Sequence, residues 1–257
     1  MNLLVNGCLG YMGREVVALC ERGYRGAVFA IGVDRSGDEM PNIYTSCNAV
    51  PTIDGIDCII DFSHHSSVAT LLDLALAGKL PTVIATTGHT RDELLLIRNA
   101  ASRIPIFLSA NMSLGVALLV ELARTAALAM PDAEIEIIER HHNRKIDSPS
   151  GTALMIAGAI CDVRPDAYIN CGRSGLSGRS HGEIGIHAVR IGSLVGEHEV
   201  MIGTQSQTIT LKHEAHSRAL FAEGAIIAAE FIMGCEAGLY NMKSLVSGER
   251  EELEELS

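Results

Sequence analysis

Positive charge is scarce in this chain. Its 257 residues include 20 lysines and arginines against 31 aspartates and glutamates, so the formal net charge is −11 at neutral pH. Such a balance lacks the general electrostatic attraction that draws proteins to nucleic acids or to anionic membranes. We therefore expect neither as a partner. The expected ligand is a small molecule, and any negative charge on it must be met by local groups.

Long uninterrupted apolar segments are also missing. The two most apolar stretches, residues 116–130 and 219–239, are each interrupted by charged side chains, which argues against a membrane span. The first residues, Met1 to Val5, read as a strand and lack the charged segment and cleavage site of a signal peptide. We expect a cytoplasmic protein.

Paired cysteine motifs are absent as well. The seven cysteines are an odd number without a Cys-x-x-Cys pair, which fits neither a disulfide framework nor a thiolate zinc site. We expect reduced, mostly buried thiols. The composition, 47% apolar and 20% charged, is that of a globular protein that can bury a large core in one or two domains.

The first 110 residues alternate short apolar segments with amphipathic ones. This order of strand, helix and strand predicts a Rossmann-type parallel sheet covered by helices, an α/β fold. Strands are predicted at residues 3–6, 28–33, 58–62, 82–85 and 105–108, and helices at about 12–20, 67–76 and 94–102. A capping box, Thr90 with Glu93, precedes the third of these helices.

The pattern changes after Asn111. A long helix is predicted at about 114–129, and the next segment, Glu134 to Glu139, alternates charged and apolar residues like a half-buried strand. Three more strands, at 183–190, 197–202 and 207–213, are separated by glycine-containing turns of hairpin length. These features predict a second, α+β domain with a mixed or antiparallel sheet. We place it at residues 113–222, with 223–257 returning to complete the first domain, 1–112.

A glycine loop follows the first predicted strand. Gly7, Gly10 and Gly13 permit a tight turn and the close approach of a pyrophosphate to a helix start. Their spacing differs from the usual Gly-x-Gly-x-x-Gly, so the loop alone is equally compatible with a plain strand-to-helix turn. Asp34 ends the second strand, where a carboxylate accepts hydrogen bonds from an adenosine ribose. The next residue, Arg35, is either a surface arginine or a partner for a 2′-phosphate, so NADH and NADPH are both expected.

Two later strand ends are expected at the same edge of the sheet. Ligands of open α/β sheets bind beyond the carboxyl ends of the strands. The alternative is that the small and hydroxylated residues at these strand ends are ordinary loop residues without a role in binding. The residues expected to line the nicotinamide and its ribose are Ala85, Thr86 and Thr87 after one strand, and Ser109, Ala110, Asn111 and Met112 after the next.

The most basic run of the chain, residues 140–145, leaves the strand that begins at Glu134. Because side chains alternate along a strand, His141 and His142 point to opposite sides, and one of them can face a ligand. Histidine titrates closest to neutral pH and suits a proton donor. Lys145 and the turn before a helix at 153–160, with Ser148 or Ser150 as cap, suit a carboxylate. Adjacent histidines diverge and nearby cations repel a metal ion, so we expect no metal.

These features together resemble the dihydrodipicolinate reductase (4-hydroxy-tetrahydrodipicolinate reductase) family, from the first strand to about residue 245. The segment His-His-x-x-Lys-x-Asp-x-Pro-Ser-Gly-Thr at 141–152 is the most specific mark, and residues 182–192 and 195–200 are also similar to the family. The resemblance implies NADH- or NADPH-dependent reduction of a cyclic imine dicarboxylate in lysine and diaminopimelate biosynthesis. It also implies a homotetramer assembled through the second, substrate-binding domain.

Carried over by position, the resemblance assigns roles to individual residues. His141 would be the proton donor, and Lys145 would assist catalysis and bind a carboxylate. The remaining substrate contacts would be His142, Gly151 and Thr152, and the cofactor contacts would be Gly7, Gly10, Tyr11, Met12, Asp34, Thr86, Thr87 and residues 109–112. This chain departs from the family in having Ala85 where glycine is frequent, and His65 where proline is common.

Two other functions remain open from the residues alone. Another two-domain NAD(P)-dependent amino-acid dehydrogenase, such as an aspartate dehydrogenase, would share the first half but would not explain the segment 141–152. A non-catalytic nucleotide-binding protein of the same fold would be favoured by loss of the histidines or the lysine, which are present.

The neighbouring Asp34 and Arg35 predict comparable use of the two cofactors. We expect kcat/KM for NADH and for NADPH to differ by less than about a hundredfold, which corresponds to about 2.7 kcal/mol of differential binding. Steady-state kinetics with each cofactor measure the ratio, and a larger preference for either one contradicts the prediction.

Overall fold

The chain divides into two compact units in the computed structural model. The structure describes residues 1–37 and 40–248. The first unit comprises Met1–Ser113 and the segment from Ala219 onward, and the second comprises Leu114–Arg218. Within the described ranges, no helix is both long and apolar enough to cross a membrane.

The first unit contains a seven-stranded sheet in the order β12-β6-β5-β4-β1-β2-β3. Every neighbouring pair is parallel, which confirms the Rossmann-type α/β prediction. The two edge strands, β3 and β12, were not predicted, because two or three residues carry too little periodicity to be recognised. The strands are β1 (Asn2–Asn6), β2 (Val28–Val33), β3 (Ile43–Tyr44), β4 (Cys58–Asp61), β5 (Thr82–Ile84), β6 (Pro105–Leu108) and β12 (Gly238–Tyr240).

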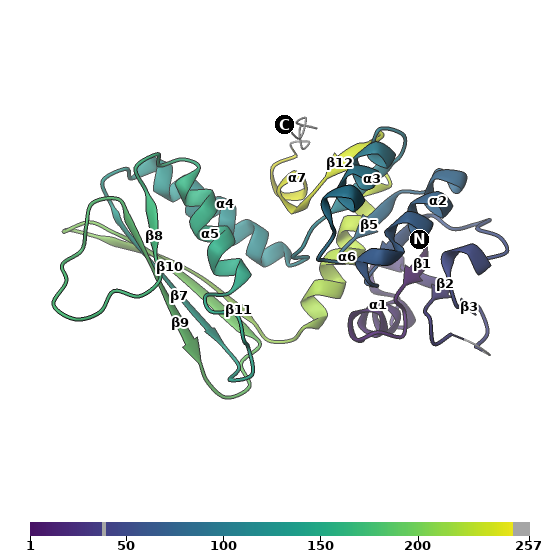
Figure 1. Cartoon of the computed structure of the whole chain (residues 1–257), viewed down its shortest axis with the longest axis horizontal. Helices are drawn as coiled ribbons and strands as arrows, with labels where there is room; N and C mark the ends of the chain where they lie inside the picture. Colours follow the sequence, from purple (N-terminus) through teal and green to yellow (C-terminus); the bar gives the residue numbers. More distant parts are fainter. Residues whose placement is uncertain (38–39, 249–257) are drawn as a thin grey trace. The chain divides into compact units, whose positions relative to one another are not determined.

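Helices cover both faces of this sheet (Figure 1). Ile106 of β6 belongs to the apolar cluster formed with α2 and α3. The next residue, Phe107, packs edge to face against Phe231 of α6, with ring centroids 6.3 Å apart. Since adjacent strand residues point to opposite faces, α6 lies on the face opposite α2 and α3. The helices are α1 (Tyr11–Glu21), α2 (Val68–Gly78), α3 (Arg91–Ala101), α6 (Ala219–Ile232) and α7 (Met242–Ser247), with short 3₁₀ turns at Tyr24–Gly26, Cys47–Ala49 and His65–Ser67.

The predicted capping box at the start of α3 is confirmed. The Thr90 hydroxyl accepts a hydrogen bond from the Glu93 N–H, and the Glu93 carboxylate accepts one from the Thr90 N–H at 2.7 Å. Glu93 also binds His65, 2.9 Å away. The backbone bond from Thr90 and the contact with His65 lower the pKa of Glu93 to about 2. His65, which departs from the family pattern, therefore links the loop after β4 to the start of α3.

The second unit contains a five-stranded mixed sheet in the order β11-β10-β7-β9-β8. The prediction of a mixed or antiparallel sheet is confirmed. Its helices, α4 and α5, pack against each other and lie on the same side of the sheet (Figure 1), with which they share an apolar core. The elements are α4 (Leu114–Ala129), β7 (Glu134–His141), α5 (Gly151–Cys161), β8 (Tyr168–Asn170), β9 (Glu183–Arg190), β10 (Gly196–Gly203) and β11 (Thr208–Ala215).

Only one of the two turns of hairpin length joins neighbouring strands. β10 and β11 do form an antiparallel hairpin. Between β9 and β10, however, lies β7, which pairs parallel with β9 and antiparallel with β10. The connection 191–195 therefore crosses the end of β7 instead of making a tight turn. A short loop limits how far apart two strands lie, but the width of one intervening strand is within its reach.

That crossing connection holds the histidine pair. The His142 N–H donates to the Leu194 carbonyl at 2.8 Å, and the Asn143 N–H donates to the Gly192 carbonyl at 3.2 Å. In the other direction, the Ile191 N–H donates to the His141 carbonyl at 2.9 Å. The backbone at the end of β7 is thus fixed on both sides, which positions the side chains that follow.

Candidate functional site

The glycine loop of the first unit depends on the absence of side chains. Gly7 has φ +80°, and a Cβ atom there would overlap the Phe62 carbonyl group. A Cβ on Gly13 would overlap the carbonyl oxygen of Gly7. Gly10 is the N-cap of α1, so the first N–H groups of the helix open onto the loop without a capping side chain. The N–H groups of a first helical turn and the positive end of the helix dipole favour the binding of an anion.

A cavity of about 490 Å³ adjoins this loop. Four residues predicted to contact the cofactor line it: Gly7, Gly10, Asp34 and Arg35. The Asp34 carboxylate accepts hydrogen bonds from the N–H groups of Leu9, at 3.1 Å, and Ser36, at 3.0 Å, so it is fixed at the end of β2. The space, the helix start and the adjacent carboxylate fit the adenosine and pyrophosphate parts of a dinucleotide.

The remaining predicted cofactor residues belong to the same unit, at the carboxyl ends of β5 and β6 and at the start of α1. Thr86 is buried, and its hydroxyl accepts a hydrogen bond from the Ser63 N–H at 3.0 Å. The Ser109 N–H donates to the Ile84 carbonyl at 3.1 Å, which brings the two segments side by side. None of these remaining residues lines the cavity of about 490 Å³. The residues at these ends are Ala85, Thr86, Thr87, Ser109, Ala110, Asn111 and Met112, with Tyr11 and Met12 on α1.

Asp61, at the end of β4, is a polar residue that the sequence reading missed. Its side chain is buried and binds the Asn6 amide at 2.8 Å and the Ser63 hydroxyl at 2.5 Å. Burial raises the pKa of Asp61, although these hydrogen bonds oppose the shift. Its signal in the sequence is a carboxylate that ends an entirely apolar strand. Asp61 anchors the loop that contacts Thr86.

In the second unit, a buried carboxylate lies at the centre of the predicted site. Glu139 of β7 is fully buried, and its Oε2 atom is 2.5 Å from Nδ1 of His141. Arg190, at the end of β9, donates to both carboxylate oxygens, at 2.8 Å and 2.7 Å. The Ser150 N–H donates to Oε1 at 3.0 Å. Burial alone would raise the pKa of Glu139, but the bonds from Arg190 and His141 outweigh it and lower that pKa.

His141 is enclosed by β10 as well as by Glu139. Its ring packs edge to face on His198, with centroids 5.1 Å apart, and Nε2 of His198 is 3.1 Å from the Ser150 hydroxyl. A Cβ atom on Gly196 would lie 2.9 Å from Nε2 of His141. Only glycine therefore leaves this nitrogen free of a side-chain contact from β10.

The start of α5 supplies an anion position beside this cluster. Ser150 is the N-cap, and its hydroxyl accepts a hydrogen bond from the Ala153 N–H at 3.2 Å, so Ser150 is confirmed as one of the two candidate caps. Lys145 forms an ion pair with Asp147 at 2.9 Å. That pair and a hydrogen bond from the Gly151 N–H lower the pKa of Asp147. A carboxylate of the chain itself thus pairs with Lys145 in the segment just before α5.

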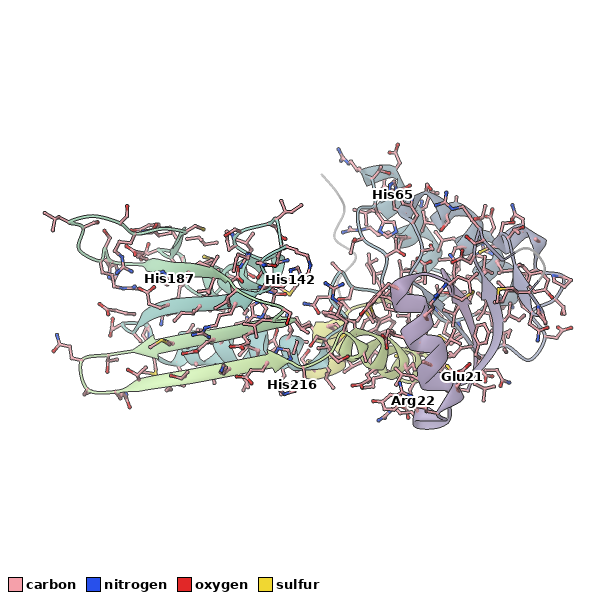
Figure 2. The ribbon with its side chains drawn as sticks, turned by 90° about the horizontal axis from the view of Figure 1, so that it is seen from below. Glu21, Arg22, His65, His142, His187 and His216 are labelled. Atoms are coloured by element: carbon pink, nitrogen blue, oxygen red, sulfur yellow. The ribbon has the colours of Figure 1, made fainter. Side chains whose placement is uncertain are left out.

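His142 follows the last residue of β7, lies at the end of the sheet in Figure 2, and is less buried than His141. Burial and the neighbouring cations Arg144 and Arg218 lower the pKa of His142. Its Nε2 atom is 3.4 Å from the Arg218 guanidinium. Of the predicted substrate residues, the structure brings His141, Lys145 and Gly151 around one network and holds His142 to the side.

The sequence reading missed three members of this network: Glu139, Arg190 and His198. Glu139 had a recognisable signal. Glu134 and Glu136 alternate with the buried Ile135 and Ile137, but the alternation reverses at the next two residues, which places Glu139 in the core. Arg190 and His198 carry no comparable signal, because their partners are distant in sequence.

A second cavity, of about 340 Å³, lies at the opposite end of β7. It is lined by the turns around Pro131 and Pro165 and by the segment from Arg179 to Glu183, none of them predicted site residues. Among residues 1–37 and 40–248, no group of three histidine, cysteine, aspartate or glutamate side chains is arranged to hold a metal ion.

The sheet, the glycine loop and the histidine-lysine network define the class of two-domain NAD(P)H-dependent oxidoreductases. Family descriptions match nearly the whole chain: "Dihydrodipicolinate reductase, N-terminus" over residues 1–112 and "Dihydrodipicolinate reductase, C-terminus" over 115–246. The chain belongs to the dihydrodipicolinate reductase family. The family therefore accounts for both units, including the segment that an unrelated dehydrogenase leaves unexplained.

Individual relatives of the chain carry the same family name. The 4-hydroxy-tetrahydrodipicolinate reductase of Caldanaerobacter subterraneus subsp. tengcongensis is 43% identical over 249 residues, covering 96% of this chain and 98% of the relative. That of Alkaliphilus oremlandii is 42% identical over 250 residues, covering 96% and 99%. The dipicolinate-bound dihydrodipicolinate reductase of Paenisporosarcina sp. TG-14 has a similar fold, with a TM-score of 0.80 at 24% identity over 94% of this chain and 97% of that one.

Buried His198 predicts a specific loss of stability in mild acid. Burial, together with the neighbouring His141, lowers its pKa from 6.5 to about 4. The unfolded chain therefore takes up this proton at a higher pH than the folded chain. The contribution to the free energy of unfolding is complete above pH 6.5 and decreases by roughly 3 kcal/mol as the pH falls to 4.

Urea denaturation between pH 7 and pH 4 measures this dependence. The variant His198→Gln, whose amide does not titrate, should show a shallower decline across the same window. Parallel pH profiles for the variant and the unmodified protein would contradict the assignment.

Proposed function

We propose that this chain reduces the cyclic imine dicarboxylate 4-hydroxy-tetrahydrodipicolinate with NADH or NADPH, and that His141 donates the proton. The observation that carries the proposal is the buried His141, held through Nδ1 by Glu139, together with the ion pair of Lys145 and Asp147 in the segment that leads into α5. A proton donor next to a carboxylate position is the arrangement that an anionic imine requires.

The contact with Glu139 determines which nitrogen of His141 acts. An ionised carboxylate only accepts hydrogen bonds, so Nδ1 carries a hydrogen in either protonation state. The nitrogen left to donate a proton to substrate is therefore Nε2, the one beside Gly196. When protonated, Nε2 donates to the position where negative charge collects during reduction.

Lys145 and the amides of Gly151 and Thr152 are the proposed carboxylate contacts. The ion pair of Lys145 with Asp147 supports this role. A substrate carboxylate that replaces Asp147 finds an ammonium and a helix start already in place. The dipicolinate bound to the Paenisporosarcina protein is itself a dicarboxylate. His142 is proposed as a secondary substrate contact.

The proposed cofactor domain is the first unit, residues 1–112 completed by 223–257, and residues 113–222 are proposed to bind substrate. A bound nicotinamide supplies the hydride from its C4 atom. Asp34 accepts hydrogen bonds from the adenosine ribose, and Arg35 faces a 2′-phosphate when one is present. The other proposed contacts are Gly7, Gly10, Tyr11, Met12, Ala85, Thr86, Thr87, Ser109, Ala110, Asn111 and Met112.

A cytoplasmic homotetramer assembled through the second unit is also part of the proposal. The family resemblance is its main support. On the sheet face away from α4 and α5, the apolar side chain of Val189 is 38% exposed, and Ile138 points the same way by alternation. Apolar groups on an open sheet face are suited to subunit contact.

Replacing the proton donor should slow catalysis. We expect His141→Gln to lower kcat by about 10² to 10⁴, the range for general acids, with NADH affinity unchanged. The control is His187→Gln, a histidine of the same sheet bound to Glu136, 2.8 Å away. An unchanged kcat in His141→Gln would remove that residue from the role.

Removal of the lysine should affect binding and turnover together. Lys145→Ala loses a charge contact to the substrate carboxylate, so KM rises and kcat falls. Arg144→Ala, which removes an adjacent cation, controls for the local electrostatic potential and should change both constants by much less. If instead only cofactor binding changes in Lys145→Ala, the lysine belongs elsewhere.

A further inference from the structure

We infer that Glu139 and Arg190 are positioning residues: their buried ion pair selects the tautomer of His141 and fixes that ring relative to the start of α5. The inference rests on the proposed role of His141 as proton donor. It extends that proposal to two residues that touch neither the expected substrate nor the cofactor, and assigns both a task in the reaction.

The four hydrogen bonds to Glu139 form a complete set. Oε2 accepts from Nδ1 of His141 and from Arg190, and Oε1 accepts from Arg190 and from the Ser150 N–H. A buried carboxylate is costly unless it is paired and hydrogen-bonded, and here both conditions hold. Each donor is therefore constrained by the same group, and a shift of one requires a compensating shift of the others.

Three separate segments meet at this ion pair. His141 ends β7, Ser150 caps α5, and Arg190 ends β9. Arg190 also donates to the Asp147 carbonyl at 2.6 Å, between the proposed carboxylate ligands Lys145 and Gly151. Glu139 and Arg190 thus fix the position of the proton donor relative to that of the proposed carboxylate ligands, although these groups lie on separate segments of the chain.

Arg190 also balances the negative charge of Glu139. A buried carboxylate with no other partner would attract the positive charge of a neighbouring imidazolium, and would thereby oppose release of the imidazolium proton. The bidentate guanidinium already balances the charge of Glu139. Glu139 can then orient His141 and accept its Nδ1–H without retaining the proton that Nε2 must give up. His198 on β10 packs edge to face on the same ring.

A comparable cluster at the other end of β7 provides a matched control. Glu136 is bound by Arg173 at 2.6 Å, by Arg179 and by His187 at 2.8 Å, so it is also a carboxylate among arginines and a histidine. His187 is labelled in Figure 2 further along the sheet from His142. Substitution of Glu136 breaks similar interactions on the same strand without touching His141.

Glutamine is an informative replacement for Glu139. Whichever carboxylate oxygen becomes the NH₂ group, that group faces two hydrogen-bond donors: either His141 with Arg190, or Ser150 with Arg190. We expect Glu139→Gln to lower kcat at least about tenfold, as expected when a catalytic histidine loses the carboxylate that sets its tautomer. We expect Glu136→Gln to keep the kcat of the unmodified protein. NADH binding, followed by fluorescence, should be unchanged in both.

A double variant separates a positioning role from a general structural one. If Glu139 acts through His141, adding Glu139→Gln to His141→Gln should cause no further loss of kcat. An additional loss as large as in the single variant would show that Glu139 supports the fold or the substrate independently, and would overturn the inference. In Arg190→Lys, which keeps the charge, kcat should exceed that in Arg190→Gln.

Nitrogen NMR of the histidine side chains tests the tautomer directly in the unmodified protein, so its result does not depend on the folding of any variant. We expect neutral His141 to carry its hydrogen on Nδ1, and to shift towards the Nε2–H tautomer in Glu139→Gln. Neutral His141 with its hydrogen on Nε2 in the unmodified protein would overturn the inference. A normal kcat in His141→Gln would instead refute the proposed function, and the tautomer result would stand separately.

Discussion

The ion pair between Glu139 and Arg190 is the interaction on which the site in the second unit depends. A fully buried carboxylate requires donors on both oxygens, and the chain supplies them from the ends of β7 and β9 and from the cap of α5. The crossing segment 191–195 then fixes the backbone of His141 and His142 from outside. The geometry of the proposed proton donor is thus a consequence of satisfying one buried charge.

Both units use the same physical device to receive anions in an acidic protein. In the first, Gly10 is the N-cap of α1, and a side chain at Gly7 or Gly13 of the same loop would overlap backbone atoms. In the second, Ser150 caps α5, and Lys145 in the preceding segment is paired with Asp147. Helix starts concentrate positive potential locally, so the net charge of −11 does not prevent the binding of a dinucleotide and a dicarboxylate.

Local patterns in the sequence were sufficient for most of the fold. The apolar segments that became β1, β2 and β4, and the Thr90 capping box, have signals contained within a few residues. The order of strands in the second sheet is not local. β7 lies between β9 and β10 although it precedes both by more than 40 residues, so the length of the loop 191–195 does not reveal that these two strands are not neighbours.

In the site, too, some residues are marked by local sequence patterns and others only by contacts between distant segments. His141, Lys145 and the start of α5 were predicted because they are close in sequence and chemically unusual. The alternation of charged and apolar residues from Glu134 does not single out Glu139, although its reversal at Ile138 and Glu139 marks Glu139 as buried. Arg190 and His198 acquire their roles only through strand pairing across the sheet, which no single-segment pattern reveals.

A crystal structure with NADH and pyridine-2,6-dicarboxylate tests the account most directly. We expect one carboxylate of the ligand on Lys145 and the amides of Gly151 and Thr152, Nε2 of His141 facing the ring, and the hydrogen bond from Nδ1 to Glu139 intact. A ligand bound away from α5, or His141 turned so that its bond to Glu139 is broken, would contradict the account.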